Sequence, residues 1–256
     1  MSDTILETKG LTRRFGGLVA VDNVDMVMRP GELVGLIGPN GAGKSTFFNC
    51  LTGFYPPSEG EVRFMDKPIT GLKPYQVAKL GIGRTFQNLR IMPNMTVFDN
   101  VSIGAIGSLG HSLRRAIWPF ECARDREVSE RTWEILSRVG LDSLGAELAA
   151  NLSYGKRKYL EIARALSTDP ELLILDEPAA GLNEQETGEL AEFIQTLNAE
   201  GLPILLVEHD MGLVMGICHR VMVLALGKKI ADDTPQAIQK DPAVLEAYLG
   251  GEECQF

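Results

Sequence analysis

The stretch Gly38-Pro39-Asn40-Gly41-Ala42-Gly43-Lys44-Ser45-Thr46 matches the phosphate-binding loop pattern G-x-x-x-x-G-K-[ST] at every fixed position. The apolar run 32–37 before it is typical of a buried strand, and residues 46–51 after it can begin a helix. Glycines let backbone N–H groups turn toward an anion, and the following helix points the positive end of its dipole at it. A glycine-rich turn without a ligand is the alternative, but it leaves the lysine and hydroxyl group after the last glycine unexplained.

Two side chains of this loop have specific roles in the pattern. Lys44 is placed to reach the β- and γ-phosphates of a nucleotide, and the Ser45 hydroxyl is placed to ligate Mg²⁺. The loop therefore predicts a site for a nucleotide and a magnesium ion.

Composition narrows the class of protein. The 256 residues suit one domain, or one domain with an additional lobe, and 45% apolar with 23% charged residues is ordinary for a soluble globular protein. The net charge of −9, from 34 acidic and 25 basic residues, argues against a general nucleic-acid binder. Four cysteines without C-x-x-C spacing indicate reduced thiols rather than a zinc site or a disulfide framework: Cys50, Cys122, Cys218 and Cys254.

Membrane and secretion signals are not found in the sequence. The first residues, 1–7, lack the basic flank and apolar core of a signal peptide. The longest apolar runs, 172–175 and 204–207, are strand-sized, whereas a membrane span needs roughly 18 uninterrupted apolar residues. Any membrane role is therefore expected to act through a partner.

Patterns along the chain predict an α/β fold. Residues 4–37 and 60–64 favour strands, residues 72–80 a short helix and residues 234–249 one or two short helices. The continuous apolar runs at 172–175 and 204–207 are typical of strands buried on both faces of a parallel sheet. We therefore expect a mainly parallel sheet preceded by an antiparallel β part.

A helical lobe is expected to interrupt this core. Residues 120–139 are charged and helix-prone, and four apolar side chains follow helical spacing: Trp133, Ile135, Leu136 and Val139. The predicted lobe covers about 88–159, so that 1–87 and 160–256 form the core of one domain.

A second motif, Leu172-Leu173-Ile174-Leu175-Asp176-Glu177-Pro178, places two carboxylates at the carboxyl end of a buried strand. Ligand sites of open α/β sheets gather at such strand ends. Asp176 suits the Mg²⁺ shell, and Glu177 suits polarising a water for attack on phosphorus. The alternative is that both acids cap the helix after Pro178.

Three weaker signals come from single residues or short loops. Ser153 and Gly155 precede a helical pattern at 159–166 and could hold an anion, although an ordinary serine N-cap is commoner. His209 follows the strand 204–207, and both structural and functional roles stay open. Gln87 could contact Mg²⁺ or the attacking water.

Taken together and in order, these elements resemble the ATP-binding cassette (ABC) ATPases over essentially the whole chain. Within that family the chain looks most similar to the ATP-binding subunits of branched-chain amino-acid importers. The stretches that carry the resemblance are Phe15-Gly16-Gly17-Leu18, Asn49-Cys50-Leu51-Thr52-Gly53-Phe54-Tyr55, Arg84-Thr85-Phe86-Gln87, Asn151-Leu152-Ser153-Tyr154-Gly155, Glu177-Pro178-Ala179-Ala180-Gly181-Leu182-Asn183 and Glu208-His209-Asp210-Met211.

The chain departs from the family pattern at a few positions. The signature usually reads Leu-Ser-Gly-Gly-Gln, whereas Tyr154 and Lys156 stand here for the first glycine and the glutamine. Phe15 replaces the usual adenine-stacking tyrosine and keeps the ring. Asn183 stands where the family normally has aspartate, which could alter dimer contacts.

The resemblance implies a P-loop NTPase that binds ATP and Mg²⁺ and hydrolyses ATP. The implied nucleotide contacts are Phe15, Gly38, Pro39, Asn40, Gly41, Ala42, Gly43, Lys44, Ser45, Thr46, Ser153 and Gly155, the implied metal contacts Ser45, Gln87 and Asp176, and the implied catalytic residues Glu177, His209, Lys44 and Gln87. Two cassettes would pair head to tail around two ATP molecules, so that Ser153 and Gly155 meet the γ-phosphate of the other subunit.

The resemblance also implies partners at the cytoplasmic face of the cell membrane. They are two integral-membrane permease subunits, a second cassette, and indirectly a solute-binding protein, with no nucleic acid. A related cassette is favoured over a homodimer. The lobe and the segment 87–100 would pass motion to the permease. The solute stays open among branched-chain amino acids, amides and urea.

Other cassette proteins are the competing functions. Those of DNA repair and chromosome organisation usually carry long coiled coils, and this chain has no such heptads. Translation-associated members normally carry two cassettes, and one is present here. Export, envelope-assembly and cluster-biogenesis cassettes are separated least well by the sequence.

Overall fold

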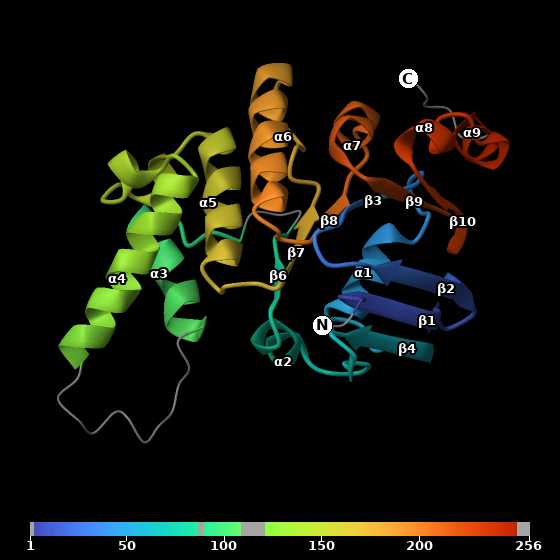
Figure 1. Cartoon of the computed structure of the whole chain (residues 1–256), viewed down its shortest axis with the longest axis horizontal. Helices are drawn as coiled ribbons and strands as arrows, with labels where there is room; N and C mark the ends of the chain where they lie inside the picture. The colour runs from blue at the N-terminus through green and yellow to red at the C-terminus, as the bar shows by residue number, and fades with distance from the viewer. Residues whose placement is uncertain (1–2, 87–89, 109–120, 250–256) are drawn as a thin grey trace.

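The computed structural model describes residues 3–86, 90–108 and 121–249, which form two sheets and the helices that cover them (Figure 1). The four-stranded antiparallel sheet has the order β2-β1-β4-β5, and the six-stranded sheet the order β10-β9-β3-β8-β7-β6. The strands are β1 Leu6–Phe15, β2 Leu18–Met28, β3 Leu33–Ile37, β4 Glu59–Phe64, β5 Lys67–Pro68, β6 Ile82–Arg84, β7 Leu172–Asp176, β8 Ile204–Val207, β9 Arg220–Ala225 and β10 Lys228–Asp233.

Most neighbours in the six-stranded sheet run parallel, and only β10 pairs antiparallel, with β9. The predicted α/β class, with its antiparallel N-terminal part, is confirmed. The helices are α1 Lys44–Leu51, α2 Pro74–Lys79, α3 Val97–Ser108, α4 Glu121–Arg138, α5 Tyr154–Leu166, α6 Glu184–Ala199, α7 Met211–Ile217, α8 Pro235–Ile238 and α9 Pro242–Leu249, with short 3-10 turns at Asp142–Leu144 and Ala149–Asn151.

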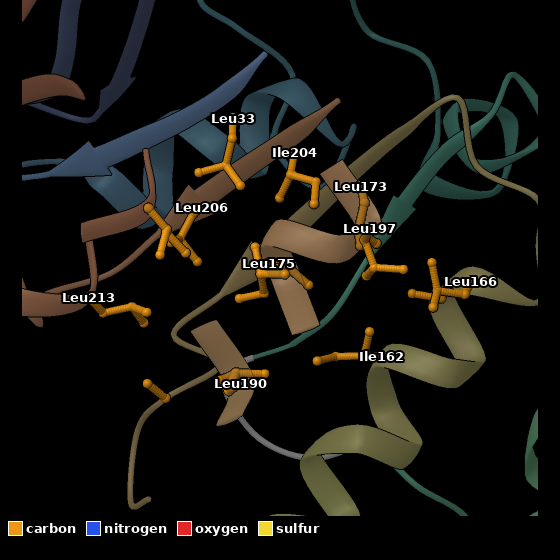
Figure 2. Close-up of a cluster of buried hydrophobic side chains, with 14 of the residues drawn as sticks. Leu33, Ile162, Leu166, Leu173, Leu175, Leu190, Leu197, Ile204, Leu206 and Leu213 are labelled. Atoms are coloured by element: carbon orange, nitrogen blue, oxygen red, sulfur yellow. The ribbon is translucent and has the colours of Figure 1, made fainter. Parts of the chain in front are cut away.

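Alternate side chains of the six-stranded sheet point to its two faces, and both faces of its inner strands β3, β7 and β8 are buried. One set packs against helices α5, α6 and α7, as Figure 2 shows for Leu33, Leu173, Leu175, Ile204 and Leu206 with Ile162, Leu166, Leu190, Leu197 and Leu213. The other set packs against α1 and the antiparallel sheet, and includes Val34, Leu36, Ile174, Leu205 and Val207 with Phe47, Phe48 and Leu51. Helix α1 therefore lies between the two sheets, with its N-terminus at the end of β3.

The predicted helical segments of the lobe are present, and α3 and α4 lie at the opposite end of the molecule from the antiparallel sheet (Figure 1). Ile135, Leu136 and Val139 are buried as their spacing predicted. Trp133 remains 44% exposed, and its ring packs against Phe98 at 5.1 Å between centroids. The predicted boundary between 159 and 160 falls inside α5, which runs without a break from the lobe into the core.

Two further expectations concern thiols and membranes. Cys50 and Cys218 are buried free thiols, and burial raises their pKa values to about 11 and about 12. The side chains of Cys122 and Cys254 lie outside the described residues. Over the described ranges, the longest helices are too short or too polar to cross a bilayer.

Candidate functional site

Two positions of the phosphate loop leave no room for a side chain, and both are glycines. At Gly38 (φ 151°) a Cβ would lie 2.1 Å from the Leu224 carbonyl oxygen, and at Gly43 (φ 99°) 2.3 Å from that of Ala20. Gly43 is the N-cap of α1 and has no side chain to occupy the first N–H groups of the helix. These donors, at the positive end of the helix, are therefore available to an anion.

Lys44 lies folded along this loop. Its ammonium donates to the carbonyl oxygens of Gly38 (2.5 Å) and Pro39 (3.2 Å), and the residue is 8% exposed. Burial lowers the pKa of Lys44, and the nearby Glu177 carboxylate opposes that shift. The cation is thus already held at the loop to which phosphates would bind.

A hollow of about 660 Å³ opens over the loop, within the size range typical of ligand pockets. Its lining combines a polar floor and apolar walls: Asn40, Gly41, Ala42, Gly43, Lys44, Ser45, Thr46, Glu177, Phe15, Leu18, Val19, Ala20, Leu226 and Gly227. The Phe15 ring packs edge-on against Tyr55 at 5.3 Å and under Arg13 at 4.5 Å. The hollow is therefore chemically suited to a ligand with a charged end and an apolar ring.

The two predicted carboxylates lie at the end of β7. The Asp176 backbone N–H donates to Thr85 Oγ1 (3.1 Å), and the residue is 7% exposed. The backbone of Glu177 lies in the left-handed region (φ 47°), a conformation that costs roughly 1–3 kcal/mol for a residue with a side chain. Its N–H donates to Val207 O (2.8 Å) and its carbonyl accepts from Lys158 Nζ (3.1 Å), so the unusual backbone is fixed from both sides. The turn brings the Glu177 side chain into the lining of the hollow.

His209 and its neighbour Glu208 follow β8. His209 Nδ1 lies 4.0 Å from Glu177 Oε2 and 3.7 Å from Glu208 Oε2, while its side chain is 61% exposed. Glu208 is fully buried, and burial raises its pKa, although its oxygens accept from the N–H groups of Ala179 (2.8 Å) and His209 (3.0 Å). Sequence reasoning gave Glu208 no role, yet it ties the loop after Glu177 to the His209 turn.

Ser153 and Gly155 lie apart from this arrangement. Among the described residues, neither belongs to the lining of the hollow. Ser153 caps α5, since its Oγ accepts from the Lys156 N–H at 3.4 Å. A Cβ on Gly155 would lie 2.8 Å from Glu186 Oε1 on α6. The signature segment therefore presents its helix N-terminus elsewhere than at the chain's own phosphate loop.

The last predicted site residue, Gln87, lies outside the described residues, but the residues before it are ordered around Arg84. The Arg84 guanidinium stacks over three rings, those of Phe48 (3.9 Å), Phe54 (4.6 Å) and Phe86 (4.6 Å). It also donates to Asn49 Oδ1 and Thr52 Oγ1 and lies 3.8 Å from Asp176 Oδ2. Burial lowers the pKa of Arg84 to about 10. Arg84 thus connects α1 with Asp176, a role that sequence reasoning missed.

Comparison with protein families gives two matches. Residues 21–180 match the model of the ABC transporter family, and residues 228–254 match that of the branched-chain amino acid ATP-binding cassette transporter. Both lie in the part of the chain that sequence reasoning compared with cassette ATPases.

Individual proteins are similar over nearly the full length. The chain is 46% identical to the high-affinity branched-chain amino acid transport ATP-binding protein LivG of Escherichia coli K12 (98% of this chain, 99% of the relative) and 43% identical to BraF of Pseudomonas aeruginosa with the same coverage. Among solved structures, the ADP conformation of MJ1267, an ATP-binding cassette of an ABC transporter, gives a TM-score of 0.86 at 34% identity (98% and 100% covered). A dimeric post-hydrolysis state of the cassette MJ0796, bound to ADP and Pi, gives 0.76 at 25% identity (90% and 99% covered).

Proposed function

The chain belongs to the ABC transporter family of ATP-binding cassettes, and on this premise we propose that it hydrolyses ATP to energise an importer of branched-chain amino acids. The observation that carries the proposal is the similarity to two such transport proteins over 98% of the chain. The resemblance to cassette ATPases predicted from the sequence is confirmed by the family match. The solute itself does not touch the cassette, so it has to be assigned by uptake assays with leucine, an amide and urea.

The nucleotide would lie with its phosphates on the 38–46 loop and its base toward Phe15. The N–H groups at the start of α1 and the Lys44 ammonium would meet the phosphates; the ammonium has three donors, and its bonds to Gly38 O and Pro39 O hold it at the loop. The Phe15 ring, 38% exposed, offers a face on which the base can stack.

The oxygen groups at the loop fit a magnesium ion. Ser45 is exposed in the lining of the hollow and Asp176 ends β7, and a hydroxyl, a carboxylate and phosphate oxygens are the hard ligands that Mg²⁺ prefers. When bound, the ion would neutralise phosphate charge during the reaction. Gln87 is proposed as a further ligand on family likeness.

Hydrolysis would use Glu177 as the base. Glu177 accepts a proton from water as the water oxygen bonds to the γ-phosphorus, while the bond from that phosphorus to the bridging oxygen breaks and leaves ADP and phosphate. His209, 4.0 Å from Glu177, orients the carboxylate and donates toward the γ-phosphate. Lys44 offsets charge on the phosphoryl oxygens. Most of the catalysis is positioning, because phosphoryl transfer asks little covalent chemistry of the protein.

A second cassette would complete the site. Because Ser153 and Gly155 lie away from their own phosphate loop, we infer that their helix terminus meets the nucleotide of a partner, as in a head-to-tail dimer. The dimeric form of the similar cassette MJ0796 supports this inference. A related chain is our favoured partner, with a homodimer as the alternative.

The permease subunits would dock at a groove of about 360 Å³ between α2 and α5. Aromatic and charged side chains line it, among them Phe54, Tyr75, Phe86, Arg84, Arg90, Glu161 and Arg164. Phe86 and Arg90 line this groove, and Arg84 connects it with Asp176. Motion of the lobe and of the segment 87–100 would pass between the nucleotide site and a permease, and binding to the permease would hold the cassette at the cytoplasmic face of the membrane.

Affinity purification from membranes of the native host tests the transport claim. We expect two polytopic permeases and a second cassette to co-purify with the tagged wild-type chain. Tyr75→Asp, at a groove residue that is 58% exposed, should lose the permeases, whereas Val27→Asp, at a residue of β2 that is 40% exposed and outside the groove, should keep them. Recovery of the wild-type chain without integral membrane proteins would contradict the importer function and leave ATP hydrolysis standing.

A further inference from the structure

The turn between β9 and β10 holds a leucine where the backbone disfavours it. Leu226 (φ 47°) and Gly227 (φ 81°) form a two-residue turn closed by the pair Ala225 and Lys228. Such turns need left-handed backbone at both central residues and favour Asn, Asp or Gly at the first. A leucine in this conformation is uncommon, because its Cβ crowds the following carbonyl oxygen.

Packing within the chain does not bury the Leu226 side chain. It is 90% exposed, the highest value among the large apolar side chains of the described residues. Met65 (φ 48°) occupies the corresponding position of the β4–β5 turn, but it is only 42% exposed. The two turns share the unfavourable backbone, and only Leu226 adds to it a nearly complete exposure to water.

The position of Leu226 is also unusual, because the turn that holds it is hydrogen-bonded to the phosphate loop. The Gly227 N–H donates to Ala42 O (3.0 Å), and Gly227 O accepts from the Asp22 N–H (2.8 Å) of β2. Leu226 lines the same hollow as Phe15 and Leu18, which come from the β1–β2 hairpin. Apolar side chains from two separate hairpins thus border one space above the loop.

We propose that Leu226 is a nucleotide-binding residue that contacts the base and ribose of the nucleotide in this hollow. The proposal rests on the nucleotide site described above. The lining residues 40–46, with their backbone N–H groups and polar side chains, and Glu177 are used by the phosphates and the reaction, which leaves the apolar lining for the nucleoside. Contact with the nucleoside removes Leu226 from water and gives a reason for a side chain that the turn and the solvent both disfavour.

Calorimetric titration of the purified chain with two probes tests this assignment, at concentrations where light scattering shows a monomer. The probes are ADP, and inorganic tripolyphosphate, which has no nucleoside. Leu226→Asn should weaken ADP binding about 3- to 10-fold, the loss expected for part of a leucine side chain. It should leave tripolyphosphate binding unchanged. The same substitution suits the left-handed turn, so Tm without ligand should rise by about 2–4 °C.

Two further variants complete the experiment. Leu226→Met keeps an apolar side chain and should retain wild-type ADP affinity, and Met65→Asn changes the matching turn away from the hollow and should leave ADP affinity unaltered. Unchanged ADP affinity in Leu226→Asn, or an equal loss of affinity for ADP and tripolyphosphate, would overturn the role of Leu226 and leave the nucleotide site standing. A wild-type chain that binds neither probe would overturn the nucleotide site as well.

Discussion

Two helices of this protein begin at motifs that contain glycine and lysine, and they use their N-termini differently. Helix α1 starts after Gly43, whose position allows no side chain, and its first residue Lys44 is buried over the loop. Helix α5 starts after Ser153, whose own hydroxyl caps it, and Lys156 in its first turn is exposed. One terminus is assembled around a hollow within its own chain. The other is capped by its own serine and does not contribute to the lining of that hollow.

A helix N-terminus becomes a binding site through the residues that surround it. At α1, neighbouring strands supply Phe15 and Glu177 to the same hollow. At α5, Glu186 of α6 lies against Gly155, and Tyr154, the first residue of the helix, lies against Gly181. The phosphate loop should therefore act in the isolated chain, whereas the signature segment should act only in an assembly.

The largest expected effect concerns Glu177, in the region complete within one chain. Glu177→Gln should keep Mg·ATP binding but lower kcat about 10³-fold, because a positioned general base contributes about 10²–10⁴-fold. Steady-state phosphate release and nucleotide titration measure the two quantities separately. Glu189→Gln on the exposed face of α6 is the control. Turnover equal to wild type would remove Glu177 from the reaction.

The next effect contrasts the two lysines directly. Lys44→Ala should weaken ATP binding about 100-fold, since hydrogen bonds to charged groups are worth about 1.5–3 kcal/mol each. Lys156→Ala should change it less than about twofold, because the Lys156 side chain is exposed and has no fixed partner at the chain's own site. Fluorescence titration of the monomer with a labelled nucleotide compares the variants. Similar losses in both would mean that the two termini are not functionally distinct in one chain.

Ser153→Ala should give a smaller, two-part effect. Loss of the cap should cost about 1 kcal/mol of the free energy of unfolding and lower Tm by about 2–4 °C. ADP binding by the monomer should not change, while turnover of the assembled dimer should fall. Ser153→Asp restores a capping oxygen and should recover Tm but not turnover, since it adds negative charge where phosphate would bind. Recovery of both would reduce Ser153 to a structural cap.

The parts of the site that the sequence predicted are those made by contiguous residues. The loop 38–46, the strand ending at Asp176 and the buried strands at 172–175 and 204–207 each carry a local pattern, and the structure has a strand before and a helix after the loop and strands at the other two stretches. Arg84 and Glu208 could not be found in this way. Their partners, such as Phe48 and Ala179, are distant in sequence or are backbone groups, so only the fold reveals the contacts.

The lobe also shows that a local sequence pattern predicts only part of the structure. The helical spacing at 133–139 correctly predicted three buried side chains, but Trp133 lies at the edge of the packed face and contacts Phe98 instead. The proposed boundary at 159 followed the start of the amphipathic pattern. The helix begins earlier, because the Ser153 cap and not the hydrophobic pattern fixes its first residue.

The smallest expected effect concerns Asn183, where the family normally has aspartate. In this chain Asn183 is the N-cap of α6, and its Oδ1 accepts from the Glu186 N–H (3.0 Å) while Glu186 Oε2 accepts from the Asn183 N–H (3.0 Å). Aspartate caps a helix as well as asparagine does, and its charge favours the helix dipole, but Glu184 and Glu186 already place two negative charges there. Asn183→Asp should therefore change the free energy of unfolding by less than about 0.5 kcal/mol. Urea denaturation measures this, and dimer turnover measured beside it shows whether the segment next to the signature tolerates the charge. A destabilisation above about 1 kcal/mol would show that the crowding of carboxylates outweighs the dipole, and that the neutral cap is what this helix requires.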